Sequence, residues 1–335
     1  MTINNTYLVI LLLLSEILYA QQPGNVKSGR QVSIDSDSNL IYLADPAIFF
    51  DKGVYYLYGT VGGNANQGFL VYTSTDMRSW QLSTETPDGY ALKKGDAFGE
   101  KNFWAPHIFS FKGKYYMAYV ANENIAIAES EHPSGPFKQS IIQALAAAVK
   151  QIDPFVFFDE DGKIYLYHVR LTNGNRLFVA ELNADLSSIK EETLRECITA
   201  EKGWENTANA PWPVAEGPSV FKRNGLYYFV YSANDFRNPD YAVGYATSTS
   251  PMGPWKKFSG NPILNKKDVG INGPGHGDFF KDRKGNLFYV LHTHYSDSKV
   301  SPRKTAIIKA GFREENGVER LVFKKNSMFF PFRKP

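Results

Sequence analysis

The chain has 335 residues, and its 37 basic and 34 acidic side chains leave a formal net charge of +3. These charges are spread along the sequence and form no basic stripe, so we expect no nucleic acid partner. The single cysteine excludes an internal disulfide framework and a multi-cysteine metal site. Aromatic residues make up 15% of the sequence, which favours strands over helices.

The N-terminal segment is predicted to be a signal peptide. Residues 7–19 form the apolar run YLVILLLLSEILY, which ends at Ala20 before the polar segment QQPGNVKSGR. The run is too short to cross a bilayer, and Glu16 interrupts it. This pattern is typical of a cleaved secretory signal. We therefore predict removal of residues 1–20, no membrane association afterwards, and a place of action in the periplasm or outside the cell.

Five segments farther along the chain share one pattern. Each contains an apolar strand, a short charged turn with a glycine, and an aromatic strand, which is typical of a β-hairpin. They are DPAIFFDKGVYYLYGT, APHIFSFKGKYYMAYV, DPFVFFDEDGKIYLYHV, GPSVFKRNGLYYFVYS and GHGDFFKDRKGNLFYVLHT, and they begin at residues 45, 105, 153, 217 and 275. Such spacing indicates a repeated supersecondary unit.

The segments between the hairpins add a third strand to each unit and leave room for a fourth. Four strands per unit make a propeller blade. The sequence therefore predicts an all-β fold in which residues 21–335 form a single five-bladed β-propeller domain. The tail TAIIKAGFREENGVERLVFKKN is predicted to form two more strands that close the ring.

Three carboxylates occupy nearly the same position in their repeats. Asp45 and Asp153 begin the first strand of their hairpins, and Glu216 lies one residue before the corresponding position. Taken singly, an aspartate before proline is more often a turn residue at a strand start. Equivalent positions of successive blades lie around one axis, so the repeat predicts that all three side chains meet at one mouth of the channel. Clustered carboxylates repel one another and raise at least one pKa, which is typical of functional sites.

This set of residues suits glycoside hydrolysis. That reaction needs a protonated carboxyl group to donate to the leaving oxygen and an ionised carboxylate to activate water or attack. Glu216 has the longer side chain and a neighbour, Asp153, whose charge disfavours ionisation, so Glu216 is the predicted acid. Asp45, two blades away, is the predicted base.

Four motifs of the chain, in this order, resemble glycoside hydrolase family 43: ADPAIFF at Ala44, FWAPHIF at Phe103, IDPFVFF at Ile152 and AEGPSVF at Ala215. The resemblance implies a five-bladed propeller that hydrolyses with inversion, mostly releasing arabinofuranose or xylose. It implies Asp45 as general base, Glu216 as general acid, and Asp153 as the residue that orients the acid and modulates its pKa. Inversion predicts that Asp45 and Glu216 lie roughly 6.5 to 9.5 Å apart.

Further residues are predicted to surround the substrate. Trp104 is predicted to stack on a sugar ring, with a packing role in the blade as the alternative. Trp212 is predicted to wall the pocket, and His107 lies at the same level of blade two. The resemblance implies that Arg303 contacts the terminal sugar, the alternative being a solvated turn charge. It also implies that His276 binds a structural calcium ion in the channel, the alternative being a hydrogen-bonded core histidine; no cofactor is expected to be required.

The sequence thus predicts an inverting, exo-acting glycosidase for terminal arabinofuranose, or xylose or galactofuranose, on plant-type polysaccharides. Long loops at residues 84–102 and 200–213 are expected to make a pocket by covering one end of the channel. One alternative is a retaining enzyme of the fructan type, although such enzymes usually have Asn where Ala44 precedes the Asp-Pro pair. The other is a non-catalytic carbohydrate-binding propeller, which would be expected to lack part of the carboxylate set.

Overall fold

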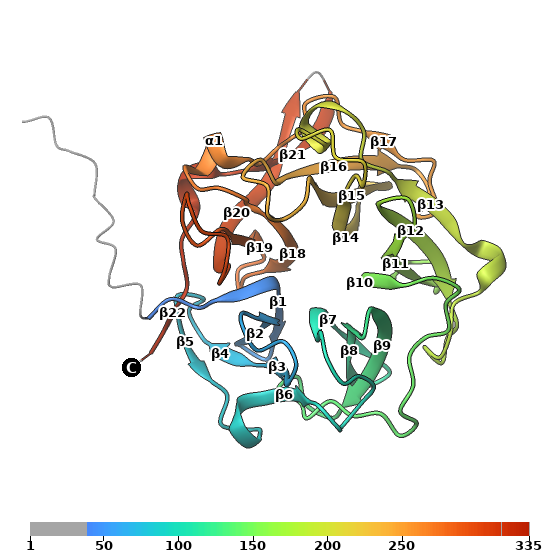
Figure 1. Ribbon diagram of the computed structural model, residues 1–335, viewed down its shortest axis with the longest axis vertical. Coiled ribbons are helices and arrows are strands. Elements are labelled where there is room, and N and C mark those ends of the chain that lie inside the picture. Colours follow the sequence, from blue (N-terminus) through green and yellow to red (C-terminus); the bar gives the residue numbers. More distant parts are fainter. Residues whose placement is uncertain (1–38, 316, 335) are drawn as a thin grey trace, which may run out of the picture. The chain divides into compact units, whose positions relative to one another are not determined.

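The structure, a computed structural model, describes residues 39–315 and 317–334. Five sheets of these residues stand around a central axis as the blades of a β-propeller, which confirms the predicted fold (Figure 1). The predicted signal segment, residues 1–20, lies outside the described residues and stays a prediction.

The strands of each blade are hydrogen-bonded in nearly sequential order. Blade one contains β1 (Leu43–Asp51), β2 (Val54–Val61), β4 (Tyr72–Ser74), β5 (Ser79–Leu82) and β22 (Phe332–Arg333), and β3 (Gly68–Leu70) and β6 (Tyr90–Lys93) form a separate two-stranded sheet. Blade two contains β7 (Trp104–Phe111), β8 (Lys114–Ala121) and β9 (Asn124–Ser130). Blade three contains β10 (Gln151–Phe158), β11 (Ile164–Leu171), β12 (Asn175–Leu182) and β13 (Arg195–Ile198).

Blades four and five follow the same order. Blade four contains β14 (Ala215–Arg223), β15 (Leu226–Ala233), β16 (Ala242–Ser248) and β17 (Lys256–Lys257), and blade five contains β18 (Gly275–Lys281), β19 (Leu287–Thr293), β20 (Lys304–Glu315) and β21 (Val318–Phe323). The short helical turns are α1 (Lys266–Val269), η2 (Pro87–Gly89), η3 (Glu191–Thr193), η4 (Gly203–Glu205) and η5 (Lys325–Ser327).

The ring closes through the C-terminal residues. The innermost strands β1, β7, β10, β14 and β18 each contact the next, and β18 contacts β1 (Figure 1). The tail predicted to close the ring instead forms β20 and β21, which complete blade five. Closure comes from β22, which pairs in parallel with β5 of blade one, and from a bridge between Leu40 and Phe332. The two predicted strands are therefore present, but their role in closing the ring was predicted wrongly, because they pair within blade five.

The hydrophobic core consists of layers between neighbouring blades. Consecutive residues of a strand point to opposite faces, and both faces of a blade are covered by its neighbours. In β2, for example, Tyr58 packs with side chains of blade two whereas Leu57 packs with side chains of blade five. In β11, likewise, Leu166 packs with side chains of blade two and Tyr167 with side chains of blade four. Burial on both faces explains why these second strands are almost entirely apolar and aromatic in sequence.

Each innermost strand has a β-bulge near its start. The pairing register shifts at Ala44/Ala47, Trp104/His107, Ile152/Phe155, Glu216/Ser219 and Gly275/Asp278. The second residue of every bulge has a left-handed backbone: Asp45 (φ 48°), Ala105 (45°), Asp153 (54°), Gly217 (61°) and His276 (42°). In four blades proline follows, which lacks an N–H and therefore gives up no ladder hydrogen bond there. Bulges re-aim side chains, and these five do so at one level of the channel.

Candidate active site

A cavity of about 390 Å³ lies at the level of the bulges. Six of its lining residues come from the first two positions of the bulges, namely Asp45, Trp104, Ile152, Asp153, Glu216 and His276. The others are Asn175 and Val214 at strand ends and Trp212, Asp235, Phe236, Arg237 and Arg303 on loops. The structure therefore brings the three predicted carboxylates into one cavity with Trp104, Trp212, His276 and Arg303.

Asp45 is held ionised by its surroundings. Its side chain is buried, and its carboxylate accepts hydrogen bonds from Arg303 Nη1 at 2.8 Å and Thr60 Oγ1 at 2.7 Å. The Nδ1 atoms of His276 and His292 each lie 3.4 Å from Asp45 Oδ1. Burial by itself would raise the pKa of Asp45, but Arg303 and then the two histidines hold it well below its ordinary value. The carboxylate is thus an acceptor of protons rather than a donor at neutral pH.

Glu216 is shifted in the opposite direction. Its carboxyl group accepts hydrogen bonds from Tyr241 Oη to Oε1 at 2.9 Å and from Asn175 Nδ2 to Oε2 at 3.0 Å. Burial raises the pKa of Glu216 to about 7, and the charge of Asp45 adds to this rise, while the hydrogen bonds from Tyr241 and Asn175 oppose it. A proton is therefore retained on this carboxyl group into the neutral range.

Asp153 is hydrogen-bonded to the backbone next to Glu216. Its Oδ2 accepts a hydrogen bond from the backbone N–H of Gly217 at 3.1 Å, the residue directly after Glu216. Burial raises the pKa of Asp153 well above its ordinary value, and the charges of Glu216 and Asp45 raise it further. This contact links blade three to the start of β14 in blade four and orients the strand that carries Glu216.

Together these groups can perform acid and base chemistry in one cavity. Pairs of carboxyl groups whose environments push their pKa values apart are suited to the two roles, because one keeps its proton while the other loses it. Asp45 is the ionised member and Glu216 the protonated one. The neighbouring tryptophans supply apolar ring faces suited to a sugar.

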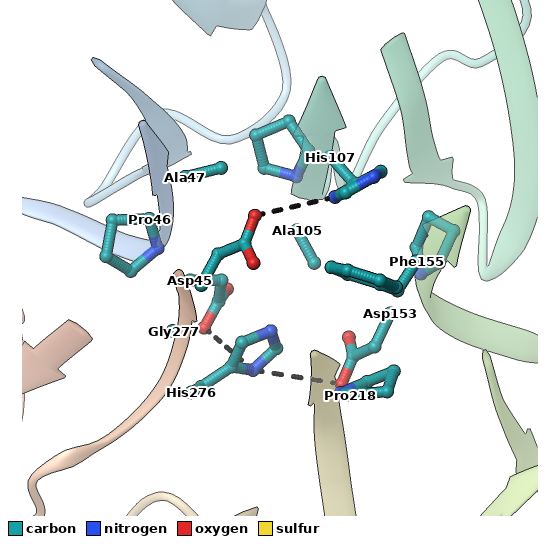
Figure 2. A pocket seen from close by; sticks show the side chains of 13 residues that line it. Asp45, Pro46, Ala47, Ala105, His107, Asp153, Phe155, Pro218, His276 and Gly277 are labelled. Atoms are coloured by element: carbon teal, nitrogen blue, oxygen red, sulfur yellow. Dashed lines mark ion pairs between the residues drawn. The ribbon is translucent and has the colours of Figure 1, made fainter. Parts of the chain in front are cut away.

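A second, smaller cavity lies in the channel next to the first. It has a volume of about 20 Å³, enough for about one water-sized molecule. Figure 2 shows the imidazole of His276 between Asp45 and Asp153, with its Nδ1 3.4 Å from Asp45 Oδ1 and 3.8 Å from Asp153 Oδ2. His107 lines this cavity and not the larger one, and its ring pairs with Asp278 at 3.6 Å. Its position does not support the predicted contact of His107 with substrate.

The side chains around His276 bear on the predicted calcium ion. Within residues 39–315 and 317–334, no group of three or more His, Cys, Asp and Glu side chains is arranged to hold a metal ion. The Nδ1 of His276 lies 3.4 Å from Asp45 Oδ1 and 3.8 Å from Asp153 Oδ2, so the ring faces two carboxylates of the larger cavity. We therefore derive no step of the reaction through a metal ion.

The remaining predicted residues lie as follows. Trp104 begins β7 at the cavity, and the indole of Trp212, 47% exposed, lies on its rim. Arg303 is bound to Asp45 and stacks its guanidinium 4.4 Å from the ring centre of Phe236. Of the two loops expected to cover the channel, residues 200–213 contribute Trp212, whereas no residue of 84–102 lines the cavity.

Four polar partners of Glu216 and Asp45 were not predicted from the sequence. Asn175 and Tyr241 donate to Glu216, Thr60 donates to Asp45, and His292 Nδ1 accepts from the backbone N–H of Asp45. Each lies on the second or third strand of a blade, or next to one. The carboxylate pattern repeats only along the first strands, so it carries no signal for these four residues.

Comparison with known proteins identifies the family. The model of glycosyl hydrolases family 43 matches residues 41–317. The chain belongs to glycoside hydrolase family 43. It is thus a glycosidase, and its substrate is a carbohydrate.

Individual family 43 relatives cover most of this chain. A β-D-galactofuranosidase (xynD) of Aspergillus niger is 26% identical, over 89% of this chain and 86% of its own. An extracellular endo-α-(1→5)-L-arabinanase of Bacillus subtilis is 28% identical, over 78% and 83%. A crystal structure titled endo-1,4-β-xylanase, from Bacteroides thetaiotaomicron, is 39% identical with a TM-score of 0.81, over 89% of this chain and 99% of that one.

In the described part of this family 43 chain, no helix has the length and apolar character needed to span a membrane.

Proposed function

We propose that the protein is an inverting, exo-acting glycoside hydrolase that releases terminal arabinofuranose, or xylose or galactofuranose, from plant-type polysaccharides. The observation that carries this proposal is the pair Asp45 and Glu216, which line one cavity with pKa values shifted in opposite directions. Relatives named for galactofuranose, arabinan and xylan support the class of sugar.

In the proposed reaction, Asp45 removes a proton from a water molecule that attacks the anomeric carbon of the sugar. Glu216 donates its proton to the departing glycosidic oxygen as the bond breaks. Arg303 keeps the base ionised, and the hydrogen bonds from Arg303 and Thr60 orient it. Asp153 positions the strand of the acid through Gly217.

The walls of the cavity support exo action. Trp212, Phe236 and Arg237 surround the carboxylates on the loops of blade four and the loop before it, which favours a pocket for one terminal sugar over an open groove. Two of the relatives are named as endo enzymes, so the sizes of the products decide between exo and endo action.

We also propose that residues 1–20 are a signal peptide and that the enzyme is exported to the periplasm or the medium. The apolar run before Gln21 and the extracellular relative support export.

The test is hydrolysis of arabinan, arabinoxylan, arabinogalactan and 4-nitrophenyl glycosides of the three sugars by purified protein. Wild type is compared with Glu216→Gln and with the matched exposed control Glu191→Gln. Loss of general acid catalysis should lower the rate on polysaccharide about 10²- to 10⁴-fold. The loss should be smaller on a 2,4-dinitrophenyl glycoside, whose leaving group needs little protonation. Chromatography that finds only monosaccharide supports exo action, and the anomer first seen by NMR reports inversion or retention.

If Glu216→Gln retains the wild-type rate on every substrate, Glu216 is not the acid. If wild type hydrolyses none of them, the substrate proposal fails and the non-catalytic alternative is favoured.

A further inference from the structure

A chain of two hydrogen bonds leads from the rim of the cavity to the carboxyl group of Glu216. The indole Nε1–H of Trp212 donates to Asn175 Oδ1 at 2.9 Å. The Nδ2 of the same amide donates to Glu216 Oε2 at 3.0 Å. The exposed tryptophan and the buried carboxyl group are therefore joined through a single amide side chain.

The indole determines which end of the Asn175 amide faces Glu216. An indole N–H can only donate, so it requires the oxygen of the amide on its side. This leaves the NH₂ group facing Glu216, where it stabilises the ionised carboxylate. Without the indole, rotation of the amide by half a turn would present its oxygen instead, and that oxygen would favour the protonated carboxyl group.

The backbone around this pair is held independently of the two side chains. The N–H of Asn175 donates to the carbonyl of Pro213 at 2.9 Å, and Asn175 forms a parallel bridge with Val214. Gly174 packs so closely that an added Cβ would lie 2.6 Å from Pro213 O. Because these contacts fix the loop of Trp212 against the start of β12, loss of the indole N–H would release the amide without displacing the loop.

We propose that Trp212 is a positioning residue that acts through Asn175 to orient and tune the carboxyl group of Glu216. This inference rests on the proposed role of Glu216 as the acid. Trp212 would then have two roles. Its indole borders the sugar, and it also influences the pKa of the proton donor Glu216.

Other groups act on Glu216 from the surrounding elements, and the test must hold them constant. Tyr241 donates to Oε1 from the start of blade four's third strand. The charged or titratable side chains that share the cavity are Asp45, Asp153, Asp235, Arg237, His276 and Arg303. Trp212→Phe and Asn175→Ala change none of them.

The experiment measures kcat/KM against pH on a 4-nitrophenyl glycoside that the wild type hydrolyses. The general acid must be protonated, so the alkaline limb reports its pKa in the free enzyme. Loss of the Asn175 donor should move this limb upward by about 1 pH unit, the size expected for one hydrogen bond to a charged group. Trp212→Phe keeps an aromatic ring on the rim and should move the limb in the same direction by about half a unit.

Two controls separate this effect from general damage. In the double variant, Trp212→Phe should add no further shift of the alkaline limb to that of Asn175→Ala, because the indole affects the pKa of Glu216 only through the amide. Trp104→Phe alters the other tryptophan of the cavity, and it should change KM while leaving the alkaline limb in place. Melting temperatures confirm that the variants are folded.

An alkaline limb that coincides in wild type and Trp212→Phe would overturn the inference. An additional shift in the double variant would also overturn it, since Trp212 would then act by another route. A failure of the proposed acid is recognised separately, by full activity of Glu216→Gln. In that event, NMR titration of ¹³C-carboxyl glutamate, with the signal of Glu216 assigned by its loss in Glu216→Gln, decides the inference directly: an upward pKa shift in Trp212→Phe supports it, and an unmoved pKa refutes it.

Discussion

Thr60 joins the base to the neighbouring blade, and its replacement by valine should destabilise the whole propeller. The hydroxyl donates to Asp45 Oδ2 at 2.7 Å and accepts from the backbone N–H of Ala105 at 3.0 Å. All three residues are buried. Valine keeps the shape of threonine but can neither donate to the carboxylate nor accept from the amide, so both groups lose a partner.

The magnitude follows from these two losses. A buried N–H left without a partner costs about 1 to 3 kcal/mol, and a hydrogen bond to a charged group contributes about 1.5 to 3 kcal/mol. Asp45 retains its bond from Arg303 at 2.8 Å, which favours the lower end of the range for the carboxylate. We therefore expect Thr60→Val to lower the free energy of unfolding by about 2.5 to 4.5 kcal/mol. For a chain of this length that corresponds to a fall in Tm of about 5 °C.

The assay is thermal and urea unfolding of wild type, Thr60→Val and the matched control Thr60→Ser. Serine keeps the hydroxyl and loses only a methyl group, so Thr60→Ser should retain most of the stability. A Thr60→Val variant that melts with the wild type would refute the interpretation of Thr60 as a link between blades one and two. Equal losses in both variants would assign the effect to the methyl group instead.

Four further predictions test the site and its supports. Wild-type kcat/KM should fall above about pH 7 as Glu216 loses its proton. Arg303→Gln should raise the pKa of Asp45 and so move the acidic limb of the pH profile to higher pH. An unmoved acidic limb would contradict the role of Arg303. Gly217→Ala, at φ 61°, places a Cβ 2.9 Å from a ring carbon of His276. It should lower the Tm by more than Gly225→Ala, a position with φ 77° and open space around the added Cβ. Equal effects would leave only the backbone cost that the two positions share, about 1 to 2 kcal/mol. A structural calcium ion in the channel predicts that EDTA lowers the Tm and added Ca²⁺ restores it, and an unchanged Tm would end that hypothesis.

The fold was predictable because its signal is local and repeated. A strand buried on both faces must be apolar at nearly every position, and a hairpin needs a glycine-containing turn. The segments from Asp45 and Asp153 show both features with little variation, so the strand pairs and their number could be recognised from the sequence. Ring closure by β22 was missed, since Phe332 and Arg333 form only a two-residue strand with no pattern of its own.

The candidate site was predictable only in its repeated part. Asp45, Asp153 and Glu216 were found because they occupy corresponding positions of first strands, and the structure places all three at one cavity. His107 also lies on a first strand, but two residues after the left-handed position of its bulge, and it faces the smaller cavity. A sequence alignment of the repeats cannot distinguish these two levels, because the bulge decides which side chain turns toward which cavity.

The sequence by itself determined the number of blades and the three acidic positions, because repetition places equivalent residues around one axis. Only the tertiary structure decided the chemical state of those residues. The pKa of Asp45 falls because of Arg303, whereas that of Glu216 rises because of burial and the charge of Asp45, against the opposing hydrogen bonds of Asn175 and Tyr241. All of these partners approach from other strands and loops. Such partners meet through long-range packing, and the electrostatic effect of each depends on distances of a few ångströms that no local pattern encodes.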